Sequence, residues 1–455
     1  MAGYSLAITR LNERWLARQV SGCHFPNPNN ENISLVVSSL QHIPFKIEDS
    51  VLSSMITLPQ GNKYWEVLGV AAKRTRQWSI PVAMNIIWVL IAFLFTIVDS
   101  FVDFDSFITV PGDAGYSIAA VWTFLLPLVV GWLWVGSQLE ADHLSKALDD
   151  ARKVTSVATT TKPTPATQTT GRSTPAIWPS TDYIDHVNAD EKRTTPIFNY
   201  SRVFIWSQNA ECILRLYKEA GGKELAQTHE GDGGSVGSGG TTSSSAVAPP
   251  AAKMHAGADG FVNNRLEGQA APKKPVFATK VFWRVLAATL LALGLQWGTT
   301  GASILIHLMT PPKGMGCRAV TFTVYGIAAT VAFWLLLLSS MLAHLARRQT
   351  IHEKRSGSKA FIGYAAMCTR WLGKTIAVIN GIGILLSCVM QLGGVYDSCF
   401  CSSTILGGNP NGLVCFLGPN IKGSEVYGYW VGGTLMAFGI SALYAFAIYI
   451  ATPMG

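Results

Sequence analysis

Five polar side chains lie inside long apolar segments of the chain. Gln296, Thr299 and Thr300 fall in one segment, and Asn380 and Gln391 fall in another. Amides and hydroxyls that are shielded from water must find hydrogen-bond partners, so they either join neighbouring helices or line a polar path for a solute. None of the five is ionisable, whereas proton-driven carriers usually place Asp, Glu or His at this depth.

Cysteines form a second set of residues that could undergo chemistry. Cys317, Cys399, Cys401 and Cys415 all follow the ends of apolar segments. An even set of cysteines on the oxidising side of a membrane favours disulfides. Cys399 and Cys401 are too close in sequence to bridge each other comfortably. We therefore expect each of them to pair with Cys317 or Cys415, in either order, and the alternative is four unpaired thiols.

A basic cluster follows another apolar segment. Arg347, Arg348, Lys354 and Arg355 lie within nine positions of one another. Such clusters bind anionic headgroups of the inner leaflet or simply anchor the end of a span. The spacing supports both interpretations.

The elements that position these residues are membrane spans. Only 14% of the residues are charged, against about 25% in a soluble protein. A bilayer core requires roughly 20 apolar residues in a helix. Six stretches meet this requirement, at about Ile80–Val98, Tyr116–Gly136, Val281–Met309, Val320–Ala343, Thr375–Val395 and Val426–Ile450.

The basic residues fix the orientation of these spans. With the N-terminus inside, 32 of the 35 Lys and Arg residues fall on the cytosolic side. This is the bias that the positive-inside rule predicts. The net charge of +8 therefore reflects membrane asymmetry, and no folded basic domain suggests a nucleic-acid partner.

The spans divide the chain into four parts. Residues 1–79 form a cytosolic region, 80–136 the first two spans, 137–278 a cytosolic loop, and 279–455 the last four spans. Tyr4, Ile8, Leu11 and Trp15 share one face and predict an amphipathic helix, on the membrane or on the cytosolic side of the protein.

The loop is largely of disordered composition, because it is rich in Thr, Ser, Gly, Ala and Pro. One exception, about 199–220, has apolar residues at helical spacing and ends at Gly221-Gly222, which predicts a helix stop. This helix either docks on the bundle or binds a cytosolic protein partner.

One region of the sequence resembles a known family. Gln296-Trp297-Gly298-Thr299-Thr300, the following turn with Gly316-Cys317-Arg318, and Arg202–Trp206 are similar to segments of multi-pass membrane proteins of filamentous fungi. That family has no established activity. The resemblance therefore implies the topology and no mechanism.

We expect an all-α bundle of six transmembrane helices with both termini in the cytosol, in the plasma membrane or another membrane of the secretory pathway. No H-E-x-x-H motif or P-loop is present, so we expect neither an enzyme nor a bound cofactor. The first hypothesis for function is a membrane adaptor or sensor that presents the cytosolic loop. The alternative is a solute transporter or channel with a polar pathway through the third and fifth spans.

The charge bias generates the first prediction. A protease-sensitive tag inserted near Gly239 will be protected in sealed cells and cleaved after permeabilisation, because the loop is cytosolic. Cleavage of the tag in intact cells would contradict this orientation.

Overall fold

The computed structural model describes most of the chain in separate stretches. They are residues 2–22, 30–42, 45–47, 52, 56, 61–74, 87, 113–135, 141–153, 156–157, 164–165, 177–179, 203–232, 279–310, 314–352, 357–393, 395–397, 401 and 423–452. The predicted first span, about Ile80–Val98, lies almost wholly outside the described residues.

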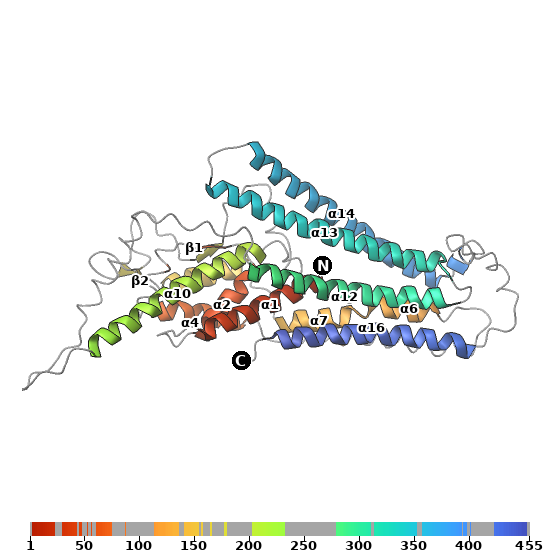
Figure 1. Cartoon of the computed structure of the whole chain (residues 1–455), viewed down its shortest axis with the longest axis horizontal. Coiled ribbons are helices and arrows are strands. Elements are labelled where there is room, and N and C mark those ends of the chain that lie inside the picture. The colour runs from red at the N-terminus through yellow and green to blue at the C-terminus, as the bar shows by residue number, and fades with distance from the viewer. Residues whose placement is uncertain are drawn as a thin grey trace, which may run out of the picture.

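Four helices of the described part are long and apolar enough to cross a membrane. They are α12 (Thr279–Met309), α13 (Cys317–His352), α14 (Gly357–Leu392) and α16 (Gly423–Ala451). Figure 1 shows them as an elongated bundle in which α12 and α16 run side by side and α13 pairs with α14. The chain is thus built as an integral membrane protein.

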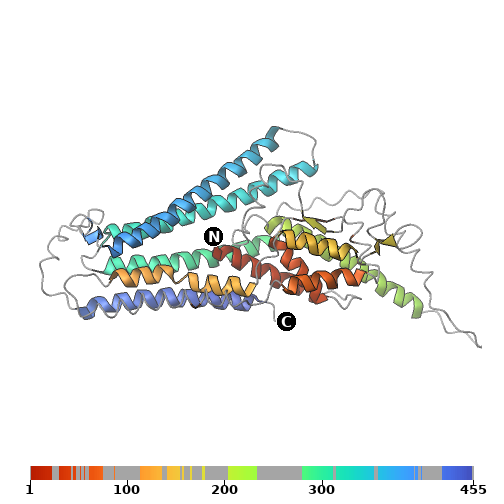
Figure 2. The ribbon, with the colours of Figure 1, turned by 180° about the vertical axis from the view of Figure 1, so that it is seen from behind.

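The predicted second span is interrupted in the structure. It consists of α6 (Asp113–Trp122) and α7 (Leu125–Val135), separated by a turn at Thr123. Pro127 lacks the amide hydrogen that would bond to the carbonyl of Thr123, four residues earlier, which explains a break at this point. The expectation of one continuous helix was therefore wrong, and Figure 2 shows the two pieces between α12 and α16.

The predicted start of the fifth span lies too far along the sequence. The sequence placed its start at Thr375, whereas the apolar part of α14 extends from Phe361 to Gln391. Arg370 therefore lies inside the helix, where its side chain is 4% exposed and its Nε donates to Ser339 Oγ at 3.4 Å. Pairing with α13 is what makes a buried cation tolerable there.

A compact head lies at one end of the bundle. It contains α2 (Asn30–Ser39), η1 (Leu40–His42), α4 (Gly61–Arg74), α8 (Ala141–Lys153) and α10 (Val203–Asp232). The short strands β1 (Phe45–Ile47) and β4 (Ile177–Pro179) pair antiparallel at its edge, and β2 (Ser156–Val157) pairs with β3 (Thr164–Pro165). Its core includes the fully buried rings of Tyr64, Trp65, Trp206 and Tyr217.

The helix predicted at 199–220 belongs to this core. As α10 it begins at Val203 and continues past Gly221-Gly222 to Asp232, so the predicted stop at the glycine pair was wrong. Glycine within a helix costs only about 1 kcal/mol relative to alanine and does not by itself end it. The apolar face of α10 is covered by the head: Trp206 Nε1 donates to the carbonyl of Val37 at 2.8 Å, and Asn209 Nδ2 to that of Phe45 at 2.8 Å.

Helix α1 (Ala2–Ser21) differs most from its expected place. Instead of lying on a surface, its first half is buried among α7, α12 and α16, and its second half joins the core of the head. All sides of this first half are buried, including Leu6, which lies opposite Tyr4 and Ile8 and packs against Gly131 of α7. The small residues Gly3, Ser5, Ala7 and Thr9 lie between these sides and let other helices approach closely. Arg10 is neutralised by a buried ion pair with Glu13 at 2.7 Å.

A disulfide closes the end of the bundle opposite the head. It joins Cys317, the first residue of α13, to Cys401 across 84 positions, and is one of the pairings that the sequence left open. The turn before it uses Gly314 with a φ of 143°. A Cβ on Gly316 would lie 2.8 Å from the carbonyl oxygen of Cys401. Cys399 and Cys415 lie outside the described residues.

The second prediction tests this bridge. Replacement C401S will lower the melting temperature of the protein in detergent, because a bridge across a loop of this length stabilises by up to about 4 kcal/mol in the chain-entropy model. Replacement C368S of an exposed free cysteine in α14 is the control and will leave the melting temperature unchanged. Non-reducing mass spectrometry that finds Cys317 as a free thiol would contradict the pairing.

Candidate functional site

The junction between head and bundle is organised around Arg284. This residue lies near the head end of α12, and only 8% of its surface is exposed. Its Nη1 donates to Asn12 Oδ1 at 2.8 Å, and its Nη2 to Ser207 Oγ at 3.3 Å. One guanidinium thus joins α12 to α1 and to α10.

An aromatic ring completes the environment of this cation. The guanidinium carbon of Arg284 lies 4.2 Å from the centroid of the Trp15 ring, within the range of a cation–π interaction. Trp15 also packs edge-on against Trp206 of α10, with ring centroids 6.0 Å apart. A lysine lacks the planar fork that makes these contacts together.

The hydrogen-bond network continues from Asn12 into the rest of the head. Asn12 Nδ2 donates to Gln41 Oε1 at 3.3 Å, and Gln41 Nε2 reaches the carbonyl of Thr9 at 3.5 Å. The network therefore runs from α12 through α1 to η1. A shift of α1 along its axis would disturb every link.

On the bundle side, α1 is held by contacts with several spans. The hydroxyl of Tyr444 donates to the carbonyl of Gly3 at 2.6 Å, and the rings of Tyr4 and Phe333 lie 5.4 Å apart. A Cβ on Gly131 of α7 would clash with the side chain of Leu6. Gly131 is thus a position where the bundle makes room for α1.

A cavity of about 370 Å³ opens beside the junction. It lies between α1, α10 and the start of α12. Its lining residues are Trp15, Gln19, Glu211, Leu214, Arg215, Lys218, Glu219 and Lys280. Trp15 belongs both to this wall and to the environment of Arg284, so the cavity and the junction share a side chain.

The five polar side chains predicted inside the spans all take part in hydrogen bonds. Gln296 Nε2 donates to Thr300 Oγ1 at 2.9 Å, and Asn380 Nδ2 donates to the carbonyl of Tyr325 at 3.0 Å. Thr299 bonds back to the carbonyl of Leu295 at 3.0 Å. These bonds pair the side chains within and between helices.

Gln391, the fifth of these side chains, has partners that the sequence did not indicate. Its Nε2 lies 3.1 Å from both Ser117 Oγ and His307 Nε2. The ring of His307 stacks on Phe322, with centroids 5.4 Å apart. Gln391 Oε1 is buried and has no hydrogen-bond partner among the described residues.

Several residues of these sites were missed or misjudged from the sequence. His307 was not among the predicted site residues, yet it lies near the end of α12 with a side chain only 6% exposed. Arg284 was not among them either. Its position four residues after Lys280, at the end of a span long enough to extend beyond the bilayer, was the signal that it meets something outside the lipid.

The proposed lipid-binding cluster is described only in part. Arg347 and Arg348 lie within α13, and their side chains are outside the description; Lys354 and Arg355 fall outside the described residues. In the part that is described, no group of three metal-binding side chains occurs.

The fold and the junction define a helical integral membrane protein with a packed head. Comparisons with family models, curated proteins and solved structures gave no match.

The third prediction concerns Arg284. Replacement R284M will destabilise the protein by about 2–4 kcal/mol, because it removes a cation–π contact and leaves buried Asn12 and Ser207 without their donor. Thermal unfolding in detergent measures the loss, and R18M, at an exposed position of α1, is the matched control.

A double-mutant cycle that combines R284M with N12A isolates the interaction between Arg284 and Asn12. We expect a coupling energy of about 1–3 kcal/mol between the two substitutions. Additive effects would contradict a direct role of the bond between Asn12 and Arg284.

Proposed function

We propose that the protein is a non-enzymatic membrane adaptor or sensor, in which a cytosolic head is mechanically coupled to the transmembrane bundle. The observation that carries this proposal is the place of α1. One continuous helix is buried in the bundle by its first half and in the head by its second half. A change in either part must therefore act on the other.

The charge distribution supports a cytosolic head. With the head inside, 32 of the 35 Lys and Arg residues lie on the cytosolic side, and the outer loops contain only Lys313, Arg318 and Lys422. This asymmetry agrees with the positive-inside rule. We propose six spans with both termini cytosolic, with α6 and α7 together serving as the second.

The head also carries the ends of the long loop. Helices α8 and α10 belong to residues 137–278, and both contribute buried side chains to the head core. We propose that the head presents the remainder of this loop to cytosolic partners. The loop would then follow any movement of α1.

A transporter or channel remains the alternative, and Gln391 is the observation that favours it. A buried amide oxygen without a partner, beside His307 and Ser117, would suit a polar solute. Against this, the pairing of Gln296 with Thr300 and of Asn380 with a backbone carbonyl favours helix packing. Solute flux into proteoliposomes that is abolished by Q391L would support the alternative.

The fourth prediction tests the coupling. Replacement G131L inserts a side chain against Leu6 and, at an overpacking cost of about 1–3 kcal/mol, will displace the first half of α1. We expect amide hydrogen exchange in α2 and α4 of the head to accelerate roughly tenfold, because the second half of α1 is part of their core.

Replacement G363L in α14 is the matched control, because a Cβ there meets nothing within 4 Å. It should leave exchange in the head unchanged. A G131L protein that exchanges faster around α1 but normally in α2 and α4 would show an independent head, and would overturn the coupling proposal.

A further inference from the structure

The cavity beside Trp15 has no role in joining head and bundle, and it lies at the level of the membrane surface. We propose that it binds the headgroup of an anionic aminophospholipid, one that carries a phosphate, a carboxylate and an ammonium group, as phosphatidylserine does. This inference deepens the proposed sensor function by naming what the head senses, and it rests on that function.

The depth follows from α12. Lys280, which lines the cavity, is the first residue of the apolar stretch that ends at Met309. Phe282 and Trp283 follow it and are 54% and 62% exposed. Exposed aromatic residues at the end of a span typically lie at the headgroup level of a bilayer. The cavity is thus open where lipid headgroups are found.

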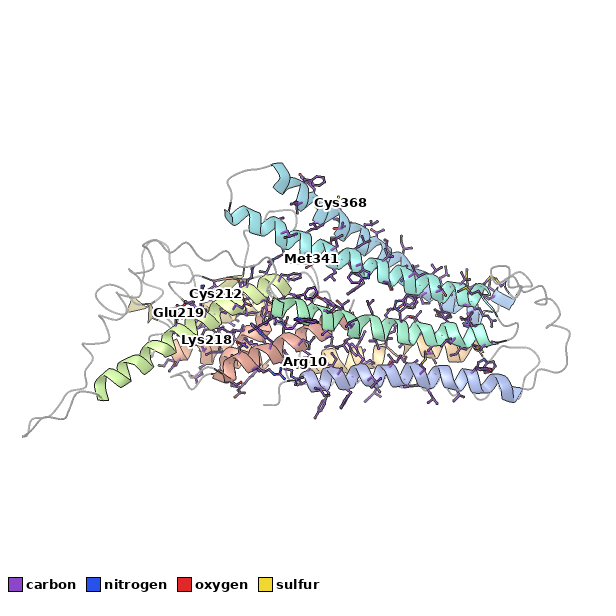
Figure 3. The ribbon with its side chains drawn as sticks, in the orientation of Figure 1. Arg10, Cys212, Lys218, Glu219, Met341 and Cys368 are labelled. Atoms are coloured by element: carbon purple, nitrogen blue, oxygen red, sulfur yellow. A yellow bond between two sulfur atoms is a disulfide. The ribbon has the colours of Figure 1, made fainter. Side chains whose placement is uncertain are left out.

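The size of the cavity suits a small polar ligand. A volume of about 370 Å³ falls at the lower end of the range of roughly 300–1,000 Å³ that ligand pockets occupy. Its floor includes the half-buried ring of Trp15 and the buried side chain of Leu214. Figure 3 shows Lys218 and Glu219 on α10, on the head side of the start of α12.

The charges of the lining select the ligand class. Three cations, Arg215, Lys218 and Lys280, face two carboxylates, Glu211 and Glu219. A ligand with two anionic groups and one ammonium has a net charge of −1, which complements the net charge of +1 of this lining, and it offers groups of both signs. A polyphosphate headgroup would place only anionic groups beside the two carboxylates.

The cations are available to a ligand. The Lys280 side chain has neither an ion pair nor a hydrogen bond with another described residue. Lys218 is exposed and reaches Gln19 Oε1 only at 3.5 Å. Arg215 Nε lies 3.8 Å from Glu219 Oε1, with about two-fifths of each side chain exposed, and Arg215 Nη2 lies 3.7 Å from Cys212 Sγ; both are weak contacts.

The ligand would act on the junction through Trp15. The same ring that forms part of the cavity wall packs against Arg284 and Trp206. A headgroup bound in the cavity is therefore one side chain away from the contacts that join head and bundle.

The experiment is calorimetric titration of the full-length protein in detergent with short-chain phosphatidylserine below its micellar concentration. The comparison ligands are short-chain phosphatidylglycerol, short-chain phosphatidylcholine, inorganic phosphate and free phosphoserine. We expect saturable binding of phosphatidylserine, and binding at least roughly tenfold weaker for the two comparison lipids, since phosphatidylglycerol lacks both the carboxylate and the ammonium group and phosphatidylcholine lacks the carboxylate.

Variants locate the site. Replacement of both cavity lysines, K218E with K280E, will weaken phosphatidylserine binding roughly tenfold or more. The matched control, K63E with K146E, makes the same charge change at exposed positions of α4 and α8 and will leave the affinity unchanged. Melting temperatures of both double variants report whether the fold is intact.

The remaining outcomes overturn the inference. Equal affinity for phosphatidylglycerol would exclude recognition of the amine, and unchanged binding in the K218E/K280E protein would exclude this cavity. Free phosphoserine binding as tightly as the lipid would make the ligand a soluble metabolite. Absence of phosphatidylserine binding, together with normal coupling between α1 and the head in hydrogen exchange, would remove this inference and leave the proposed function standing.

Discussion

The arrangement of head and bundle depends on the need to satisfy one buried guanidinium. Arg284 stands where α12 leaves the membrane, and its burial would be prohibitive without partners. The structure supplies an amide from α1, a hydroxyl from α10 and the face of an indole. Because these partners come from three separate parts of the sequence, satisfying the charge also fixes how α1 and α10 sit on α12. The buried charge of Arg284 therefore serves mainly to orient α1 and α10 on α12, and contributes less to the stability of the fold.

The long spans were predictable because length and apolar composition determine them. The sequence placed the third span at Val281–Met309 and the sixth at Val426–Ile450, within a few residues of the helices. The burial of α1 was not predictable in this way. Its pattern shows one apolar face, whereas the remaining sides, which are also buried, include Gly3, Ser5 and Thr9, which are small or polar and carry no hydropathy signal. The break before Pro127 was readable from the chemistry of proline, but the apolar composition on both sides hid it.

The polar residues of the bundle show the same limit. Composition singled out Gln296, Asn380 and Gln391 because they stand in apolar runs, but their partners depend on how helices pack. Ser117 lies in α6 and His307 near the end of α12, 190 positions apart, and only the fold brings them to the same amide. Pairing of this kind is a tertiary property, so the sequence identifies polar groups that need partners and not the partners themselves.

The hydrogen bond between Tyr444 and Gly3 spans 441 positions of the chain. A ribosome completes α1 long before α16, so the first half of α1 has no finished binding site until α16 has been made. Until then its apolar face and its buried ion pair must remain outside the bundle, exposed to the aqueous phase or held by other factors. Closure of α1 against the bundle therefore follows the insertion of α16.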